Sequence, residues 1–134
     1  MAHTKARILH VDDHQDTRLL MSALLGQSGY GVITAGTVAE GLQVAREIPF
    51  DLSILDVRLP DGTGIELAQE IRKLQPNAPI LYYSAYADDE EQKRALAICG
   101  DSYVRKPVCI ADLEDAIASL LEKKKAREMA VGAN

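Results

Sequence analysis

Aromatic residues, cysteine and long apolar runs are all scarce in this sequence. It has no Trp and one Phe among 134 residues, yet 47 % of its residues are hydrophobic. Aliphatic side chains must therefore form the core, as is typical of sheets covered by helices on both faces. No apolar run approaches the roughly 20 residues of a membrane helix, and the N-terminus lacks the apolar stretch of a secretory signal. We expect one cytoplasmic domain that does not contact a membrane.

The cysteine pattern and the net charge exclude further classes of protein. Cys99 and Cys109 form no metal-ligand pattern or disulfide framework, so we expect both to be packing residues with reduced thiols. The formal net charge is -5, and the run Lys123-Lys124-Lys125 is too short to reverse it. Because nucleic acid attracts positive charge, we expect no direct nucleic acid binding by this chain.

Short apolar segments alternate five times with segments of helical periodicity. Right-handed crossovers of this length force a parallel sheet with helices on both faces, so the fold class is a doubly wound α/β fold. Residues 1–5 are expected to be an N-terminal tail, and residues 125–134 a C-terminal tail or the start of a linker. The expected strands are Arg7–Val11, Gly31–Ala35, Asp51–Asp56, Pro79–Tyr83 and Ser102–Val104, and the expected helices lie within 15–27, 38–48, 64–75, 88–98 and 110–121.

The ends of these strands carry the residues capable of chemistry. In an open parallel sheet, ligands bind beyond the carboxyl ends of the strands. Asp12 and Asp13 follow the first strand, Asp56 ends the third, Ser84 follows the fourth and Lys106 follows the fifth. We therefore expect three carboxylates, a hydroxyl and an ammonium group to converge.

This combination favours metal-dependent phosphoryl transfer. Three acidic side chains in one pocket repel each other unless a cation neutralises them, and Mg²⁺, or Mn²⁺, suits oxygen ligands. Mg²⁺ commonly bridges carboxylates to phosphate, while Lys and Ser contact phosphoryl oxygens. A carboxylate is also a known nucleophile in such reactions, so one of the aspartates is expected to accept the phosphoryl group.

Four motifs resemble those of the receiver domains of bacterial two-component response regulators. They are Val11-Asp12-Asp13, the segment from Asp56 to Gly64, Ser84-Ala85, and the segment from Tyr103 to Pro107. The resemblance covers residues 6–124. It implies a flavodoxin-like (βα)5 fold with a five-stranded parallel sheet in the order 2-1-3-4-5. It also implies a phospho-accepting signalling domain that catalyses only its own phosphorylation and dephosphorylation.

The resemblance assigns the acceptor and the metal ligands. Asp56 would be the phosphoacceptor, with Asp13 and Asp56 binding Mg²⁺ directly and Asp12 acting mainly through water. The main-chain carbonyl of Arg58 would be a further ligand, and Lys106 would contact the phosphoryl group.

The resemblance also assigns a switch. Ser84 would move to hydrogen-bond the phosphoryl group, and Tyr103 would change its burial in response, which alters the surface formed by the fourth helix, fifth strand and fifth helix. Pro107 matches a peptide bond that is often cis in the family. Arg58 and Tyr86 occupy variable positions beside the path of the hydrolytic water, where they would tune the lifetime of the phosphorylated form.

Three alternative functions remain open beside the receiver domain. A phosphatase of the haloacid-dehalogenase type would need a second Asp where this chain has Arg58, and a flavodoxin-type flavin module would need a phosphate-binding loop in place of Asp12-Asp13-His14. A degenerate, unphosphorylated interaction module is the third alternative. The expected partners are a sensor histidine kinase or histidine phosphotransfer protein and a downstream protein or effector domain of unknown identity.

Other polar residues are expected to have structural roles. His10 lies in a buried strand, and His14 opens the first helix at the border of the site. Four aspartates stand at turns or element starts, where local hydrogen bonding favours Asp. They are Asp51, Asp61, Asp88 and Asp89.

Overall fold

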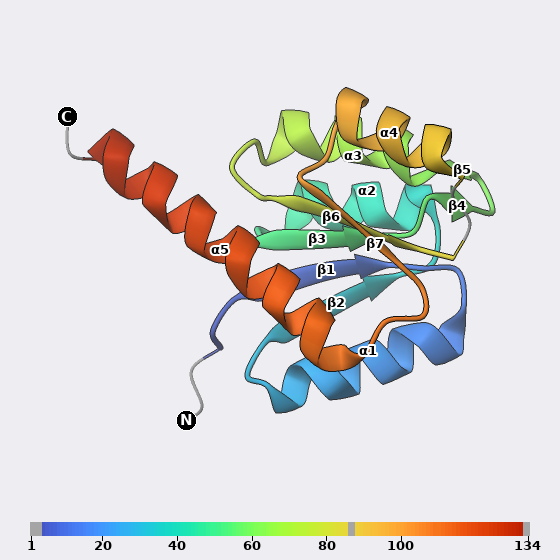
Figure 1. Ribbon diagram of the computed structural model, residues 1–134, viewed down its shortest axis with the longest axis horizontal. Coiled ribbons are helices and arrows are strands. Elements are labelled where there is room, and N and C mark those ends of the chain that lie inside the picture. Colours follow the sequence, from blue (N-terminus) through green and yellow to red (C-terminus); the bar gives the residue numbers. More distant parts are fainter. Residues whose placement is uncertain (1–3, 86–87, 133–134) are drawn as a thin grey trace.

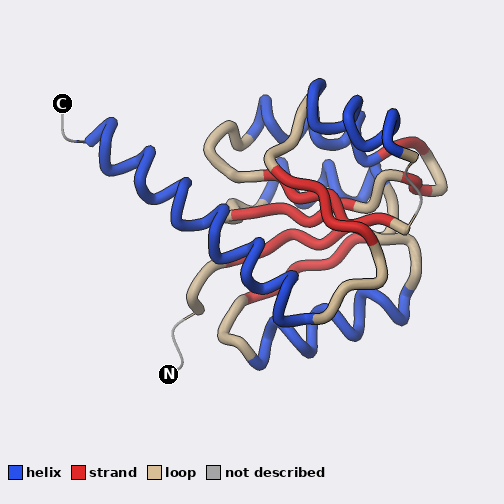
Figure 2. The backbone as a smooth tube through the Cα atoms, viewed as in Figure 1, coloured by secondary structure: helices blue, strands red, loops and turns tan. Residues whose placement is uncertain are grey.

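A five-stranded parallel sheet forms the centre of the computed structural model, which describes residues 4–85 and 88–132 (Figures 1 and 2). The strand order is β2-β1-β3-β6-β7, and every neighbouring pair is parallel. Counted along the main sheet alone, this is the order 2-1-3-4-5 that the family resemblance implies. The strands are β1 Arg7–Val11, β2 Gly31–Ala35, β3 Leu52–Leu55, β6 Ile80–Ser84 and β7 Ser102–Arg105.

Helices cover both faces of the sheet (Figure 1). Two helices lie on one face and three on the other. Each strand can pack against both groups of helices because its side chains alternate between the faces. On β1, Ile8 packs with the residues of α1 and α5, whereas Leu9 and Val11 pack with those of α2, α3 and α4. The helices are α1 Gln15–Gln27, α2 Val38–Glu47, α3 Gly64–Leu74, α4 Asp89–Ile98 and α5 Ile110–Gly132.

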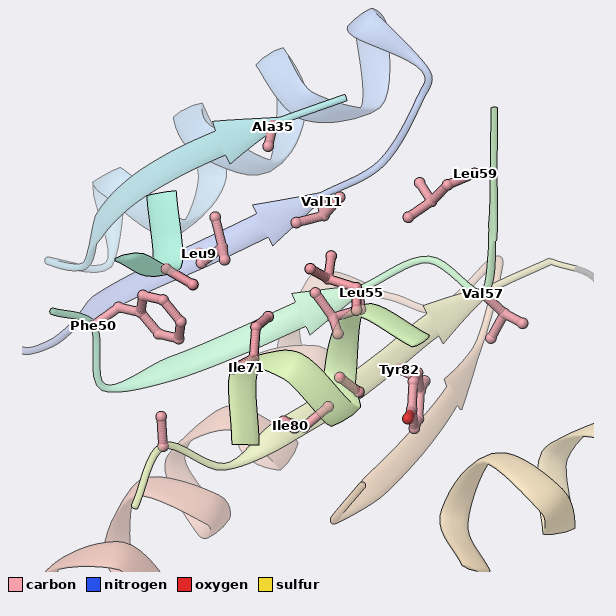
Figure 3. Close-up of a cluster of buried hydrophobic side chains, with 14 of the residues drawn as sticks. Leu9, Val11, Ala35, Phe50, Leu55, Val57, Leu59, Ile71, Ile80 and Tyr82 are labelled. Atoms are coloured by element: carbon pink, nitrogen blue, oxygen red, sulfur yellow. The ribbon is translucent and has the colours of Figure 1, made fainter. Parts of the chain in front are cut away.

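The core is almost entirely aliphatic, as the composition predicts. On the α2–α4 side, Leu55 and Ile80 of the sheet lie near Ile71 of α3 (Figure 3). These three side chains and Leu67 of α3 belong to one cluster and are fully buried. Tyr82 is the largest buried side chain, and its hydroxyl donates a hydrogen bond to the carbonyl of Cys99. This rigid, two-sided core fixes the positions of the strand ends.

A short antiparallel hairpin follows β3, where the sequence indicated only a turn. Its strands are β4 Arg58–Leu59 and β5 Gly62–Thr63. Asp61 in the hairpin turn accepts hydrogen bonds from the backbone amides of Val38 (2.7 Å) and Ala39 (3.0 Å), the first residues of α2. Asp61 thus stands at a turn, as expected, and its carboxylate also caps a helix that begins 23 residues earlier in the chain.

Helix α3 begins very close to the end of β3. The amide of Gly64 donates to the carbonyl of Val57 at 2.7 Å, and a Cβ atom on Gly64 would lie 2.0 Å from the carbonyl oxygen of Asp56. Only glycine allows the backbones to approach this closely. The loop that carries Asp56 is therefore packed directly against the first turn of α3.

Helix α5 continues to Gly132, well past the apolar stripe that ends at Leu121, and its C-terminal turns project beyond the sheet (Figure 1). Lys124 ties the extension to the domain, with its Nζ 3.5 Å from Asp51 Oδ1 and 3.0 Å from Glu128 Oε1. The domain boundary at residue 124 stays a prediction. Among the residues that the structure describes, no helix combines the length and apolarity that crossing a membrane requires.

The two cysteines differ in their surroundings. Cys99 is half-buried and packs against the core, as expected. Cys109 is exposed, so the expectation that it packs is wrong. It lies just before α5, where the chain leaves the sheet edge.

Candidate functional site

The expected strand-end residues meet at the carboxyl edge of the sheet. Backbone hydrogen bonds continue past the strands and fix the first residues of each loop. The amide of Asp12 donates to Ala35 (3.0 Å), that of Asp56 donates to Val11 (2.9 Å), and that of Lys106 donates to Ser84 (3.0 Å). The sheet thus positions these side chains before any ligand is present.

Lys106 connects the two most buried carboxylates. Its Nζ lies 2.5 Å from Asp12 Oδ2 and 3.3 Å from Asp56 Oδ2, and it also lies 5.2 Å from the centre of the Tyr83 ring. Asp12 is fully buried, whereas Asp56 retains 7 % exposure. The Lys106–Pro107 peptide bond is cis, as the family resemblance implies.

The electrostatics of this pair favour the charged forms. Burial alone would raise the pKa of Asp12, but hydrogen bonds from Lys106 and from the His14 amide outweigh it, so the pKa is lowered. Burial alone would lower the pKa of Lys106, yet the hydrogen bond to Asp12 and the charge of Asp56 raise it. A carboxylate and an ammonium group therefore face each other within the site.

Four side chains form a set able to hold a metal ion. One ligand atom from each of Asp12, Asp13, His14 and Asp56 lies within 4.8 Å of the others. The three carboxylates are the hard oxygen donors that Mg²⁺ prefers, so the residues present fit this ion. The sequence analysis predicts a structural role for His14, but the structure places its ring beside the carboxylates. The position of His14 directly after Asp13 indicates this proximity.

Ser84 and Tyr103 lie on adjacent strands next to this set. Ser84 is fully buried at the end of β6, and Tyr103 lies on β7, which pairs with β6. The hydroxyl of Tyr103 is buried and makes no hydrogen bond of normal geometry with another described residue. Burial raises the pKa of Tyr103, and the nearby Ser84 hydroxyl opposes the rise. The two residues thus lie on paired strands, and their role as a switch stays a prediction.

Of the two residues expected to tune the lifetime of the phosphorylated form, Arg58 lies within the described part of the chain. Arg58 opens β4, and its 64 % exposed side chain forms an ion pair with Glu91 of α4. Its role as a main-chain metal ligand stays a prediction. Tyr86 lies outside the described residues.

Among the remaining polar residues, Asp88 has a local partner, whereas the partner of Asp51 lies 44 residues away in the chain. His10 is buried in β1, as expected, and burial lowers its pKa to about 4. Asp88 caps α4 by accepting from the amide of Glu91 at 2.8 Å. Asp51 accepts from the amide of Arg7 at 2.8 Å.

Comparisons with known proteins agree with this geometry. The family description "response regulator receiver domain" matches residues 8–118. The chain is 32 % identical over 118 residues to the response regulator protein PilR of Pseudomonas aeruginosa, a match that covers 88 % of this chain and 26 % of PilR. The chain therefore spans about a quarter of the length of this curated relative.

Solved structures are similar over nearly the whole chain. A CheY-like receiver domain protein from Methanospirillum hungatei superposes with a TM-score of 0.87 at 33 % identity, covering 90 % of this chain and 97 % of that one. A response regulator from Burkholderia pseudomallei, solved with a phosphorylated aspartic acid, a calcium ion and citrate, has a TM-score of 0.80 at 26 % identity. That match covers 91 % of this chain and 72 % of that one.

Proposed function

The chain belongs to the response regulator receiver domain family, a phospho-accepting module of two-component signalling, and from this premise we propose that Asp56 accepts the phosphoryl group. Receiver domains take phosphate from histidine kinases. The donor here would be the phosphohistidine of a sensor histidine kinase or a histidine phosphotransfer protein. A carboxylate oxygen of Asp56 would bond to phosphorus as the nitrogen–phosphorus bond of the donor breaks, leaving a neutral or protonated imidazole on the donor.

The observation that carries the proposal is the position of Lys106 between Asp12 and Asp56. Both oxygens of Asp12 are engaged, Oδ1 by the His14 amide at 2.9 Å and Oδ2 by Lys106 at 2.5 Å, and the side chain is fully buried. Asp56 lies 3.3 Å from Lys106 and is accessible at its 7 % exposed edge. Asp56 thus combines access for a donor with a cation that would bind the transferred group.

The metal would be Mg²⁺ or Mn²⁺. When bound, the ion would neutralise the acidic set and the phosphoryl oxygens. Asp13 and Asp56 would bind it directly, Asp12 through water, and Arg58 through its main-chain carbonyl. The response regulator from Burkholderia pseudomallei, solved with a phosphorylated aspartic acid and a calcium ion, supports a phosphoacceptor aspartate and a divalent cation in this fold.

The same site would control the surface formed by α4, β7 and α5. A phosphoryl group on Asp56 adds negative charge and acceptor oxygens, which Lys106 and Ser84 are placed to meet. Movement of Ser84 would remove a neighbour of the Tyr103 hydroxyl and so change the burial of Tyr103. A downstream protein or effector domain would bind the altered surface.

Acetyl phosphate with Mg²⁺ provides the test. Intact-mass analysis is expected to show one added phosphoryl group on the wild-type chain and none on Asp56→Asn. Asp112→Asn, an exposed change in the first turn of α5, is the matched control and should be labelled like the wild type. Labelling of Asp56→Asn to the wild-type level would overturn the assignment. Asp13→Ala is expected to lower the Mg²⁺ affinity in a calorimetric titration, and an unchanged affinity would refute its ligand role.

A further inference from the structure

We propose that His14 supplies a nitrogen ligand to the ion at this site. This ligand would raise the affinity of the site for first-row transition ions such as Zn²⁺, but not its affinity for Mg²⁺. The inference rests on the proposed function only in placing the ion among the acidic residues. It concerns a residue, His14, to which the family resemblance assigns no role in binding.

The spacing of the ligand atoms is the first observation. His14 Nδ1 lies 3.1 Å from Asp13 Oδ1 and 3.3 Å from Asp12 Oδ1. For metal–ligand bonds of about 2.1 Å, adjacent ligands are about 3.0 Å apart in an octahedral site and about 3.4 Å apart in a tetrahedral one. The imidazole therefore already stands at the distance from both carboxylates that neighbouring ligands of one ion adopt.

The local structure shows why the ring is available for this role. His14 is the N-cap residue of α1, with extended backbone angles of -85° and 115°, and its side chain makes no capping hydrogen bond to the helix. The amide of His14 itself donates to the carboxylate of Asp12. The ring is 70 % exposed, so it adds little to the core. Its polar neighbours on the site side are the carboxylates of Asp12 and Asp13.

Asp12 separates the imidazole from the lysine. Its Oδ1 faces His14, whereas its Oδ2 faces Lys106. An ion held directly by His14 and Asp13, and through water by Asp12 Oδ1, would therefore not displace Lys106 from its contacts with Asp12 and Asp56. The two cations would occupy opposite sides of one buried carboxylate.

The chemistry of the donor atoms gives the selectivity. Carboxylate and carbonyl oxygens suit Mg²⁺ and Mn²⁺, whereas imidazole nitrogen suits Zn²⁺ and the later transition ions. Carboxylates also bind Zn²⁺, so a Zn²⁺ affinity by itself would not identify a nitrogen ligand. The diagnostic quantity is therefore the part of the Zn²⁺ affinity that disappears when the imidazole is removed.

The experiment compares Zn²⁺ and Mg²⁺ binding without any phosphoryl donor. All proteins carry His3→Ala, because the N-terminal sequence Met1-Ala2-His3 offers another imidazole to transition ions. We expect His14→Gln to weaken Zn²⁺ binding at least tenfold and to change Mg²⁺ binding less than twofold. Asp16→Asn, which removes a neighbouring charge in the first turn of α1, is the control and should affect both ions alike.

Nitrogen NMR of the histidine rings gives a second readout. In the protein with only His10 and His14, Zn²⁺ should shift the Nδ1 resonance of His14, whereas Mg²⁺ should not. An unshifted resonance, or equal Zn²⁺ affinities for the His14→Gln variant and its parent, would overturn the proposal and leave His14 as a hydrogen-bonding neighbour of the carboxylates. A failure of Asp56 phosphorylation would instead refute the proposed function and leave the Zn²⁺ result intact.

Discussion

Arg58 and Glu91 form an ion pair, with a guanidinium nitrogen 3.6 Å from Glu91 Oε2, that joins the segment after Asp56 to the first turn of α4. Arg105, the residue before Lys106, contacts the same turn through Asp89 at 2.8 Å. Two arginines that flank the site residues in sequence thus hold the start of α4. A phosphoryl group on Asp56 would add negative charge two residues before Arg58 in the chain, where we expect it to compete with Glu91 for the exposed guanidinium group.

The lifetime of the phosphorylated form should depend on Arg58 and Tyr86. Hydrolysis needs a water molecule in line behind the phosphorus atom, and bulky side chains that shield this approach slow it. We expect faster first-order decay after donor removal in Arg58→Asn, in Tyr86→Glu and in the double variant. A tenfold change needs only about 1.4 kcal/mol in barrier height. Arg46→Asn, in the last turn of α2, is the control, and unchanged or slower decay in the site variants would show that they do not guard Asp56.

Phosphorylation should change the dynamics of α4. Its first turn is acidic, and Ala95 is its only fully buried residue, so its packing against the core is weak. Beryllofluoride, which mimics the phosphoryl group, is expected to alter hydrogen exchange across α4 and β7. In Glu91→Gln, exchange of the first turn should already be faster before the mimic is added, because the ion pair with Arg58 is lost. The prediction fails if protection from Ser84 through Val104 is the same with and without the mimic.

Removing the charge of Lys106 should separate metal binding from phosphorylation. Lys106→Met replaces the lysine with an uncharged side chain of similar length, and so leaves Asp12 and Asp56 without their cation. The site becomes more negative, so Mg²⁺ affinity should rise by about tenfold, or about 1.4 kcal/mol, while labelling by acetyl phosphate falls. Calorimetry and intact-mass analysis measure the two effects, with Lys123→Met on the exposed face of α5 as the control. A lower Mg²⁺ affinity would contradict the electrostatic argument.

Gln75 should contribute to stability by connecting three segments. At the end of α3, its side-chain amide donates to the carbonyls of Ala45 and Ile48, both at 2.9 Å, and its oxygen accepts from the amide of Phe50 at 2.9 Å. Gln75→Leu would leave these partly buried groups without partners and should lower the free energy of unfolding by about 2 kcal/mol.

Urea denaturation measures this loss. Gln69→Leu, on the exposed face of the same helix, is the matched control and should change stability little. Equal stabilities of the two variants would show that water replaces the hydrogen bonds of Gln75.

The alternation of apolar strands and amphipathic helices determined the fold class from sequence, because burial on both faces of a parallel sheet imposes that pattern. It also placed Asp12, Asp56 and Lys106 at one edge, since the carboxyl ends of parallel strands must coincide. The strand order came from the family resemblance, because periodicity carries no information on which strands are neighbours.

Only the tertiary structure decided the finer arrangement. The hairpin of β4 and β5 has strands of two residues, too short for any periodicity to reveal. The extension of helix α5 beyond Leu121 is an exception, because the helix propensity of Ala, Lys, Arg, Glu and Met already favours it in the sequence. The capping of α2 by Asp61, the full burial of Asp12 beside a 34 % exposed Asp13, and the approach of His14 to both carboxylates depend on distances between side chains. Those distances are set by how the packed elements lie in space, and the sequence spacing of the residues does not contain them.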